Sequence, residues 1–236
     1  MRVSAVIPGA GRSLRFSRES DPSSSQDRKQ FKFLGNQPLI FFTLQPFFES
    51  NIVSSIALVV PHDVVRWMRE KVKDRLLEKE VTVIPGGSRR QDSVWNGLKE
   101  VSGSCDVVVV HDAVRPFFKK EWIEETVELC SNFDGAIVAV RANDTLKRVK
   151  NEIISATLPR GEIWHAQTPQ TFNTDVLLSA FENARTAGVT CTDEAQLVEL
   201  NGGRVAIVEG SFQNIKITTR EDWVVAESIW EKLNHD

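Results

Sequence analysis

Six short apolar runs recur along the 236-residue chain, and they constrain the fold more than any other feature of the sequence. They lie at residues 3–7, 56–60, 81–84, 107–110, 136–140 and 205–208. Because almost every residue in them is apolar, we expect strands that are buried on both faces of a mostly parallel sheet. Helical patterns separate the runs, at residues 40–49, 63–78, 92–100, 121–130, 175–187, 193–200 and 220–233. This alternation predicts a doubly wound α/β fold, with helices on both faces of the sheet.

No break in composition and no long linker divides the chain, so we expect a single domain over residues 1–236. Two segments interrupt the alternation of strands and helices. Residues 17–28 are polar and rich in turn formers, which predicts a mobile loop. Residues 146–157 form two extended stretches around 150–152, which predicts a hairpin in a projecting β-arm at about 142–160. A two-stranded arm is only marginally stable alone, so it favours a partner subunit.

Composition excludes several classes of protein. The formal net charge is −3 and no basic run occurs, so we expect no nucleic-acid partner. No apolar stretch approaches membrane-spanning length, and the first apolar run is too short for a signal peptide, so we expect a cytoplasmic protein without a membrane partner. Neither the three cysteines nor the four histidines have the spacing of a disulfide framework or a zinc site.

The first apolar run leads directly into the glycine-rich segment PGAGRSLR, residues 8–15. Glycines let backbone N–H groups approach an anion, and Arg15 and the later Lys29 add positive charge, so the segment predicts a phosphate-binding loop. It is neither a dinucleotide fingerprint, since Leu14 stands where the third glycine is needed, nor a P-loop. The alternative is a tight strand-to-helix turn without a ligand.

Ligands of open α/β sheets gather at the carboxyl ends of the strands, so the residues that follow each strand are candidates for a site. Residues 85–93 form a glycine turn rich in hydrogen-bond donors, although Ser88 or Asp92 could simply cap a helix there. Asp112 follows the fourth run, where a carboxylate can hold Mg²⁺ against a nucleotide. The alternative is that Asp112 caps a helix or pairs with Arg115.

The remaining polar residues favour phosphoryl chemistry without a covalent intermediate. Scattered cations and hydroxyls at 144–148, 160, 164–170, 192–195 and 214–218 suit a second, phosphorylated substrate. No nucleophile stands with a base and an orienting group. His111 could act as a base, but a buried histidine with satisfied hydrogen bonds is the favoured interpretation. A phosphomonoester with a second pKa of about 6 needs no strong base, so catalysis reduces to positioning and charge neutralisation.

Seven ordered motifs, taken together, resemble the 2-C-methyl-D-erythritol 4-phosphate cytidylyltransferase family. They lie at residues 8–15, 28–31, 86–94, 111–116, 168–170, 192–195 and 214–218, and so extend over nearly the whole chain. The resemblance implies a Rossmann-like nucleotidyltransferase fold and Mg²⁺ as cofactor. It also implies transfer of CMP from CTP to 2-C-methyl-D-erythritol 4-phosphate, which gives 4-diphosphocytidyl-2-C-methyl-D-erythritol and pyrophosphate in the non-mevalonate route to isoprenoid precursors.

The same resemblance implies a role for individual residues. The catalytic residues that grip the triphosphate or flank the reacting phosphates would be Arg15, Lys29 and Lys216, and Asp112 would bind Mg²⁺. The nucleotide site would comprise Gly9, Ala10, Gly11, Gly87, Ser88, Ser93 and Ala113. Methylerythritol phosphate would be bound by Thr145, Arg160, Arg115 and Thr192, with Thr145 and Arg160 acting across the interface of a homodimer with shared active sites.

Some positions depart from the family's pattern, and two other functions stay open. Arg28 stands where proline is usual and the serine-rich gap before it is longer than typical, which leaves Lys32 as an alternative to Lys29, the expected catalytic lysine. Gln213 replaces a frequent acidic residue near the metal. One alternative is a ribitol-5-phosphate cytidylyltransferase. The residue types in the motifs at 91–94 and 192–195 argue against it. The other is a non-catalytic nucleotide-binding regulator, which would need no metal carboxylate at the reacting phosphate.

Overall fold

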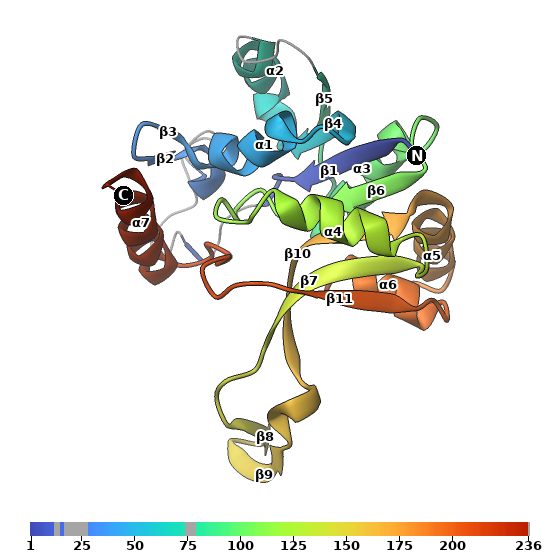
Figure 1. The fold of residues 1–236 in the computed structure, drawn as a ribbon, viewed down its shortest axis with the longest axis vertical. Helices are drawn as coiled ribbons and strands as arrows, with labels where there is room; N and C mark the ends of the chain where they lie inside the picture. Colours follow the sequence, from blue (N-terminus) through green and yellow to red (C-terminus); the bar gives the residue numbers. More distant parts are fainter. Residues whose placement is uncertain (12–14, 17–27, 74–78, 236) are drawn as a thin grey trace.

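The computed structural model describes residues 1–11, 15–16, 28–73 and 79–235. Within them a seven-stranded sheet has the order β11-β7-β10-β6-β1-β4-β5 (Figure 1). Its strands are β1 (Val3–Pro8), β4 (Val53–Val60), β5 (Glu80–Pro85), β6 (Val107–Val110), β7 (Gly135–Arg141), β10 (Trp164–Asn173) and β11 (Val205–Glu209). A small separate hairpin joins β2 (Phe33–Leu34) to β3 (Gln37–Pro38).

The predicted apolar runs all lie in strands of this sheet, and the prediction of a mostly parallel sheet is confirmed. Neighbouring strands are parallel except at β10, which runs antiparallel to both β6 and β7. Sequence analysis missed β10 as a strand. Four of the six residues in its buried stretch, Gln167, Thr168, Gln170 and Thr171, are polar, and only Pro169 and Phe172 are apolar, so no hydrophobic pattern marks it.

Helices appear where the sequence predicts them, with ends shifted by a few residues. They are α1 (Leu39–Glu49), α2 (Val65–Lys73), α3 (Arg90–Val101), α4 (Glu121–Leu129), α5 (Thr174–Thr186), α6 (Glu194–Leu200) and α7 (Arg220–His235). Short 3-10 helices are η2 (Lys29–Phe31), η3 (His62–Val64) and η4 (Arg160–Glu162). The predicted end of the second helix, 74–78, and most of the predicted loop, 17–27, lie outside the described residues.

Alternate residues of each central strand pack on opposite faces of the sheet. In β1, Ile7 joins a cluster with α1, α2 and α4, whereas Val6 joins a second cluster with α3, α5 and α6. Gly97 brings α3 close to the sheet, because a Cβ there would lie 2.4 Å from Val6 Cγ1. Each large apolar side chain buried in this way contributes about 1.5–3 kcal/mol. Both faces are therefore covered, which confirms the predicted doubly wound architecture.

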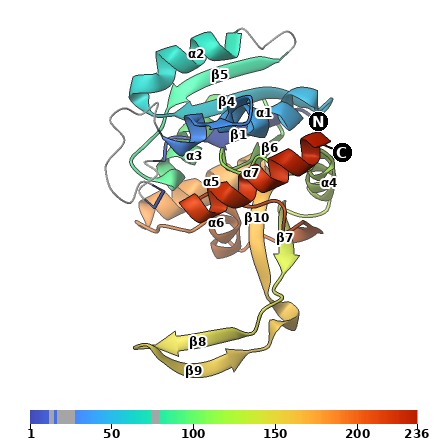
Figure 2. The ribbon, with the colours of Figure 1, turned by 90° about the vertical axis from the view of Figure 1, so that its left-hand side faces the viewer.

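The chain between β7 and β10 leaves the sheet and forms a projecting hairpin at the place predicted for an arm (Figures 1 and 2). It comprises β8 (Leu146–Lys150) and β9 (Ile153–Leu158). Asn151 and Glu152 both have positive φ, 49° and 63°, as the two central residues of a type I′ turn do. Val149, Ile153 and Ile154 are 55%, 72% and 59% exposed, so apolar surface on the arm faces solvent in the single chain.

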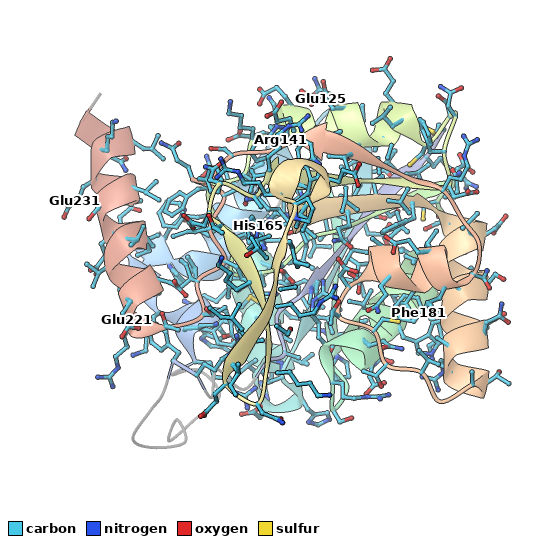
Figure 3. All side chains as sticks on the ribbon, turned by 90° about the horizontal axis from the view of Figure 1, so that it is seen from below. Glu125, Arg141, His165, Phe181, Glu221 and Glu231 are labelled. Atoms are coloured by element: carbon cyan, nitrogen blue, oxygen red, sulfur yellow. The ribbon has the colours of Figure 1, made fainter. Side chains whose placement is uncertain are left out.

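Helix α7 lies beside the β2–β3 hairpin (Figure 1). Seen from below, it flanks one side of the molecule (Figure 3). Ala226 of α7 packs with Phe16, Leu34, Leu39 and Ile217 in a third apolar cluster. This cluster fixes the segment 214–218 that leads into the helix. Of the helices in the described parts of the chain, none has the length and apolar character needed to span a membrane.

Candidate active site

A cavity of about 630 Å³ opens at the carboxyl ends of β1, β4, β5 and β6. The structure brings ten of the predicted site residues to its wall: Gly9, Ala10, Gly11, Arg15, Lys29, Gly87, Ser88, Ser93, Asp112 and Lys216. The wall also includes residues to which sequence analysis assigned no role, namely Pro8, Arg28, Gln30, Pro61, His62, Asp63, Gly86, Arg89, Arg90, Val114 and Thr218. The predicted phosphate loop, metal carboxylate and lysines thus share one cavity.

Backbone packing and a neighbouring segment fix the glycine loop after β1. The Gly9 N–H donates to the Val59 carbonyl at 2.6 Å, which ties the loop to β4. Gln30 Nε2 donates to the carbonyls of Gly9 and Gly11, at 2.7 and 3.2 Å, and Arg28 Nη1 donates to that of Ala10 at 3.1 Å. Sequence analysis placed Arg28 and Gln30 in a motif but did not foresee that they hold the loop.

Lys29 lies between those two residues and lines the cavity. Its Nζ donates to the Ile217 carbonyl at 2.6 Å, so the lysine also bridges to the segment that carries Lys216. Burial, followed by the charges of Lys216 and Arg15, lowers the pKa of Lys29 to about 8. Lys32, the other candidate, instead lies over the Phe16 ring at 5.5 Å. Of the two candidates Lys29 is the one that lines the cavity, and its catalytic role stays a prediction.

Asp112 comes directly after β6 and is only 5% exposed. Its Oδ1 accepts from Arg90 Nε at 2.9 Å, and its Oδ2 lies 2.8 Å from Lys216 Nζ and 3.5 Å from Arg115 Nε. Burial raises the pKa of this carboxyl, but Arg90, Lys216 and Arg115 together hold it well below its usual range. Asp112 is therefore an ionised carboxylate in a ring of cations that includes Arg115, its predicted alternative partner, and its binding of Mg²⁺ stays a prediction.

Arg90 and Glu194 form a second ion pair behind Asp112, and sequence analysis did not single out either residue. Arg90 Nη1 and Nη2 donate to Glu194 Oε1 and Oε2 at 2.7 and 2.9 Å. Burial raises the pKa of Glu194, against the opposing charge of Arg90. The two residues stand in separate motifs 104 positions apart, so one sequence shows their charges but not their contact.

His111 is fully buried beside Asp112. One ring nitrogen, Nδ1, lies 2.9 Å from Thr168 Oγ1, and the other, Nε2, lies 3.0 Å from the Arg115 carbonyl. Burial lowers the pKa of this imidazole to about 3, so His111 is neutral near pH 7. The structure thus supports the favoured interpretation of a core histidine with satisfied hydrogen bonds.

The glycine turn after β5 packs closely against both the first loop and the start of α3. A Cβ at Gly86 would lie 2.3 Å from Ala10 Cβ, and one at Gly87 would lie 2.4 Å from Asp92 Cβ. The Gly87 N–H donates to Ser93 Oγ at 3.1 Å. Both glycines are therefore required by packing within the protein, and Ser93 holds the shape of the turn that faces the cavity.

Two predicted residues lie behind the cavity wall rather than on it. Ala113 is buried, its Cβ lies 3.2 Å from the position of a Cβ at Gly9, and its carbonyl accepts from Thr43 Oγ1 at 3.1 Å. Arg115 is also buried, and its Nη1 donates to the Asn214 carbonyl at 2.6 Å. Arg115 thus links Asp112 to the segment that carries Lys216.

The other three predicted substrate residues do not line this cavity within the single chain. Thr192 is exposed, and both its N–H and its hydroxyl bond to Gln196 Oε1, at 2.9 and 3.2 Å, at the start of α6. Thr145 and Arg160 are exposed at the base of the arm, where Arg160 donates to the Asn143 carbonyl. Their predicted contacts with substrate stay predictions.

Comparison with known proteins identifies the family. Residues 3–232 match the family model described as "IspD: 2-C-methyl-D-erythritol 4-phosphate cytidylyltransferase". Curated proteins of that name from Geotalea uraniireducens and Geobacter metallireducens are 39% and 41% identical, over 100% and 99% of this chain and 100% of each relative. The solved 4-diphosphocytidyl-2C-methyl-D-erythritol synthase of Anaerococcus prevotii is 25% identical, with a TM-score of 0.85 over 98% of this chain and 96% of that one. The chain therefore belongs to the 2-C-methyl-D-erythritol 4-phosphate cytidylyltransferase family.

Proposed function

We propose that this chain transfers CMP from CTP to 2-C-methyl-D-erythritol 4-phosphate, forming 4-diphosphocytidyl-2-C-methyl-D-erythritol and pyrophosphate. One observation carries the proposal beside family membership. A glycine loop, the cations Arg15, Lys29 and Lys216, and the ionised carboxylate of Asp112 line the same cavity at the carboxyl ends of the strands. Such a set binds a triphosphate and neutralises charge on it.

In the proposed reaction, an oxygen of the substrate phosphate attacks the α-phosphorus of CTP. A new P–O bond forms, the bond from the α-phosphorus to the bridging oxygen breaks, and pyrophosphate leaves. The attacking phosphate is already mostly dianionic at neutral pH, so no protein base is needed. The neutral, buried state of His111 agrees with this. Arg15, Lys29 and Lys216 are assigned to stabilise negative charge on the pentacoordinate transition state.

We assign Mg²⁺ to Asp112 as part of the same proposal. The described residues contain no group of three or more His, Cys, Asp or Glu side chains that could hold a metal alone. Mg²⁺ usually binds one or two protein carboxylates together with phosphate oxygens, so a single carboxylate on a triphosphate cavity fits it. When bound with the nucleotide, the ion supplies further neutralisation of phosphate charge.

The acceptor site is proposed to be shared between two protomers. Thr145 and Arg160 stand at the base of the arm and do not line the cavity of their own chain. Exposed apolar side chains on the projecting hairpin support its docking on a partner. In the resulting homodimer, Thr145 and Arg160 of one protomer would bind methylerythritol phosphate beside the partner's cavity, near Arg115 and Thr192.

An assay of pyrophosphate release tests the function. The protein is incubated with CTP, Mg²⁺ and either 2-C-methyl-D-erythritol 4-phosphate or ribitol 5-phosphate. We expect faster turnover of the methylerythritol substrate, and faster turnover of ribitol phosphate would overturn the proposed acceptor. Lys29→Ala should lower turnover by orders of magnitude with a much smaller change in CTP affinity. Equal losses in both would indicate a protein that only binds the nucleotide.

A further inference from the structure

Arg90 and Glu194 form a buried, bidentate ion pair behind Asp112. Glu194 is 1% exposed, and both of its carboxylate oxygens accept from the Nη atoms of Arg90. The third nitrogen of that guanidinium, Nε, donates to Asp112 Oδ1 at 2.9 Å. Arg90 thus contacts two different carboxylates, and its bidentate pair is with Glu194.

The charges around Asp112 show why this division matters. Arg90, Arg115 and Lys216 all lie within 3.5 Å of its oxygens. An arginine prefers a bidentate pair with a carboxylate. Without Glu194, the nearest carboxylate for the Nη atoms of Arg90 would be Asp112 itself. Arg90 would then be free to make a bidentate pair with Asp112 and to occupy both of its oxygens.

The partner of Oδ2 is different in kind. Lys216 has a side chain that is 36% exposed and lines the cavity, so its ammonium group can move from Asp112 to a phosphate oxygen. Arg115, in contrast, is held by the Asn214 carbonyl at 2.6 Å. How much of the Asp112 carboxylate is free to bind a metal ion therefore depends on Arg90 making only one hydrogen bond with it.

From this geometry, and resting on the proposed function, we propose that Glu194 is a positioning residue for the cytidylyl transfer. By holding both Nη atoms of Arg90, it limits that guanidinium to a single bond with Asp112 and leaves Asp112 able to bind the divalent cation that accompanies the nucleotide. Glu194 itself touches neither substrate nor metal. Removing a residue that positions a metal ligand without touching the metal typically lowers metal affinity by about 10–100-fold.

The test measures metal binding without turnover. Mn²⁺ is titrated into the full-length protein with CTP but no acceptor, and free Mn²⁺ is followed by electron paramagnetic resonance. Glu194→Gln should weaken CTP-dependent Mn²⁺ binding by about tenfold or more. Glu199→Gln makes the same substitution at an exposed position of the same helix, and should bind Mn²⁺ as the wild type does.

Further variants separate positioning from simple stability. If Glu194→Gln lowers the melting temperature but leaves Mn²⁺ affinity unchanged, Glu194 is only structural and the inference fails. The double variant Arg90→Met with Glu194→Gln also removes the guanidinium that would otherwise pair with Asp112. Its Mn²⁺ affinity should therefore return to within about threefold of wild type. A loss as large as that of the single variant would overturn the inference.

A shorter carboxylate covers the case in which Glu194→Gln does not fold. Glu194→Asp keeps the buried charge but cannot reach both Nη atoms, so we expect an intermediate loss of Mn²⁺ affinity, and wild-type affinity would refute the inference. Pyrophosphate release by the wild type is measured separately. Its absence would overturn the proposed function, whereas normal release with an unchanged metal affinity in Glu194→Gln would overturn the inference alone.

Discussion

Raising the pH should remove the charge of Lys29 within an experimentally accessible range. The pKa of this lysine is about 8, because burial and the nearby charges of Lys216 and Arg15 disfavour its ammonium form. With that value, about nine-tenths of the protein carries a charged Lys29 at pH 7, and about one-tenth does at pH 9. If only the charged form supports cytidylyl transfer, kcat/KM for CTP should fall about tenfold between these two pH values.

The direction of the effect follows from the type of group. A lysine is charged below its pKa, so activity is present below pH 8 and is lost as the pH rises through that value. Bound triphosphate favours the charged form and raises the pKa of Lys29 in the complex. The decline in kcat, which reports the enzyme–substrate complex, should therefore lie at higher pH than the decline in kcat/KM, which reports the free enzyme.

Initial rates of pyrophosphate release at constant ionic strength, from about pH 6.5 to 10, measure both profiles. Lys29→Arg is the matched variant, because an arginine keeps its charge up to a pH of about 12. Its residual kcat/KM should show no decline near pH 8. A wild-type kcat/KM that stays flat to pH 10, or a Lys29→Arg profile that falls like the wild type, would refute this assignment of Lys29.

Two further predictions concern packing and assembly. Gly86→Ala should lower the free energy of unfolding by about 1–3 kcal/mol and weaken CTP binding, because its Cβ would lie 2.3 Å from Ala10 Cβ. Urea unfolding measures this change, and the control is Gly103→Ala, whose Cβ meets nothing within 4 Å and whose stability should stay within about 0.5 kcal/mol of wild type. Equal stability of the two variants would contradict the packing argument. Sedimentation velocity should show that the wild type is a homodimer. Combining Ile153→Ser with Ile154→Ser should convert it to a poorly active monomer, because both side chains are exposed on the arm. A fully active monomer would rule out shared active sites.

The buried strands could be predicted from sequence because their side chains interact with the whole core rather than with one partner. β6 is four valines, and any sheet position covered on both faces suits them. β10 could not be found in that way. Its buried Gln170 pairs with Asp193 Oδ2 at 3.0 Å, and Thr171 with Thr126 at 2.7 Å. Polar side chains of this kind are buried only because particular distant partners satisfy them, and a single sequence does not show those pairs.

The predicted site residues also divide into those that the topology of the sheet places and those that depend on one particular distant partner. Gly9 and Asp112 follow buried strands, so the topology alone carries them to one edge of the sheet. Ala113 also follows a strand, but its small side chain is used to pack behind Gly9 instead of facing the cavity. Arg90 and Glu194 became visible only through their contact in three dimensions, because charge type alone does not indicate which of many ions will pair.

The ring of charges also explains why a carboxylate lies at the centre of the proposed phosphate-binding cavity. Beside burial, the charges of Lys216 and Arg15 lower the pKa of Lys29, since the cations of the proposed triphosphate site repel one another. Asp112 opposes this, since its charge raises the pKa of Lys29 and its Oδ2 holds Lys216 at 2.8 Å. Two fixed arginines, Arg90 and Arg115, in turn keep Asp112 ionised despite its burial. The carboxylate thus favours the charged form of Lys29 and holds Lys216 in place at the cavity wall.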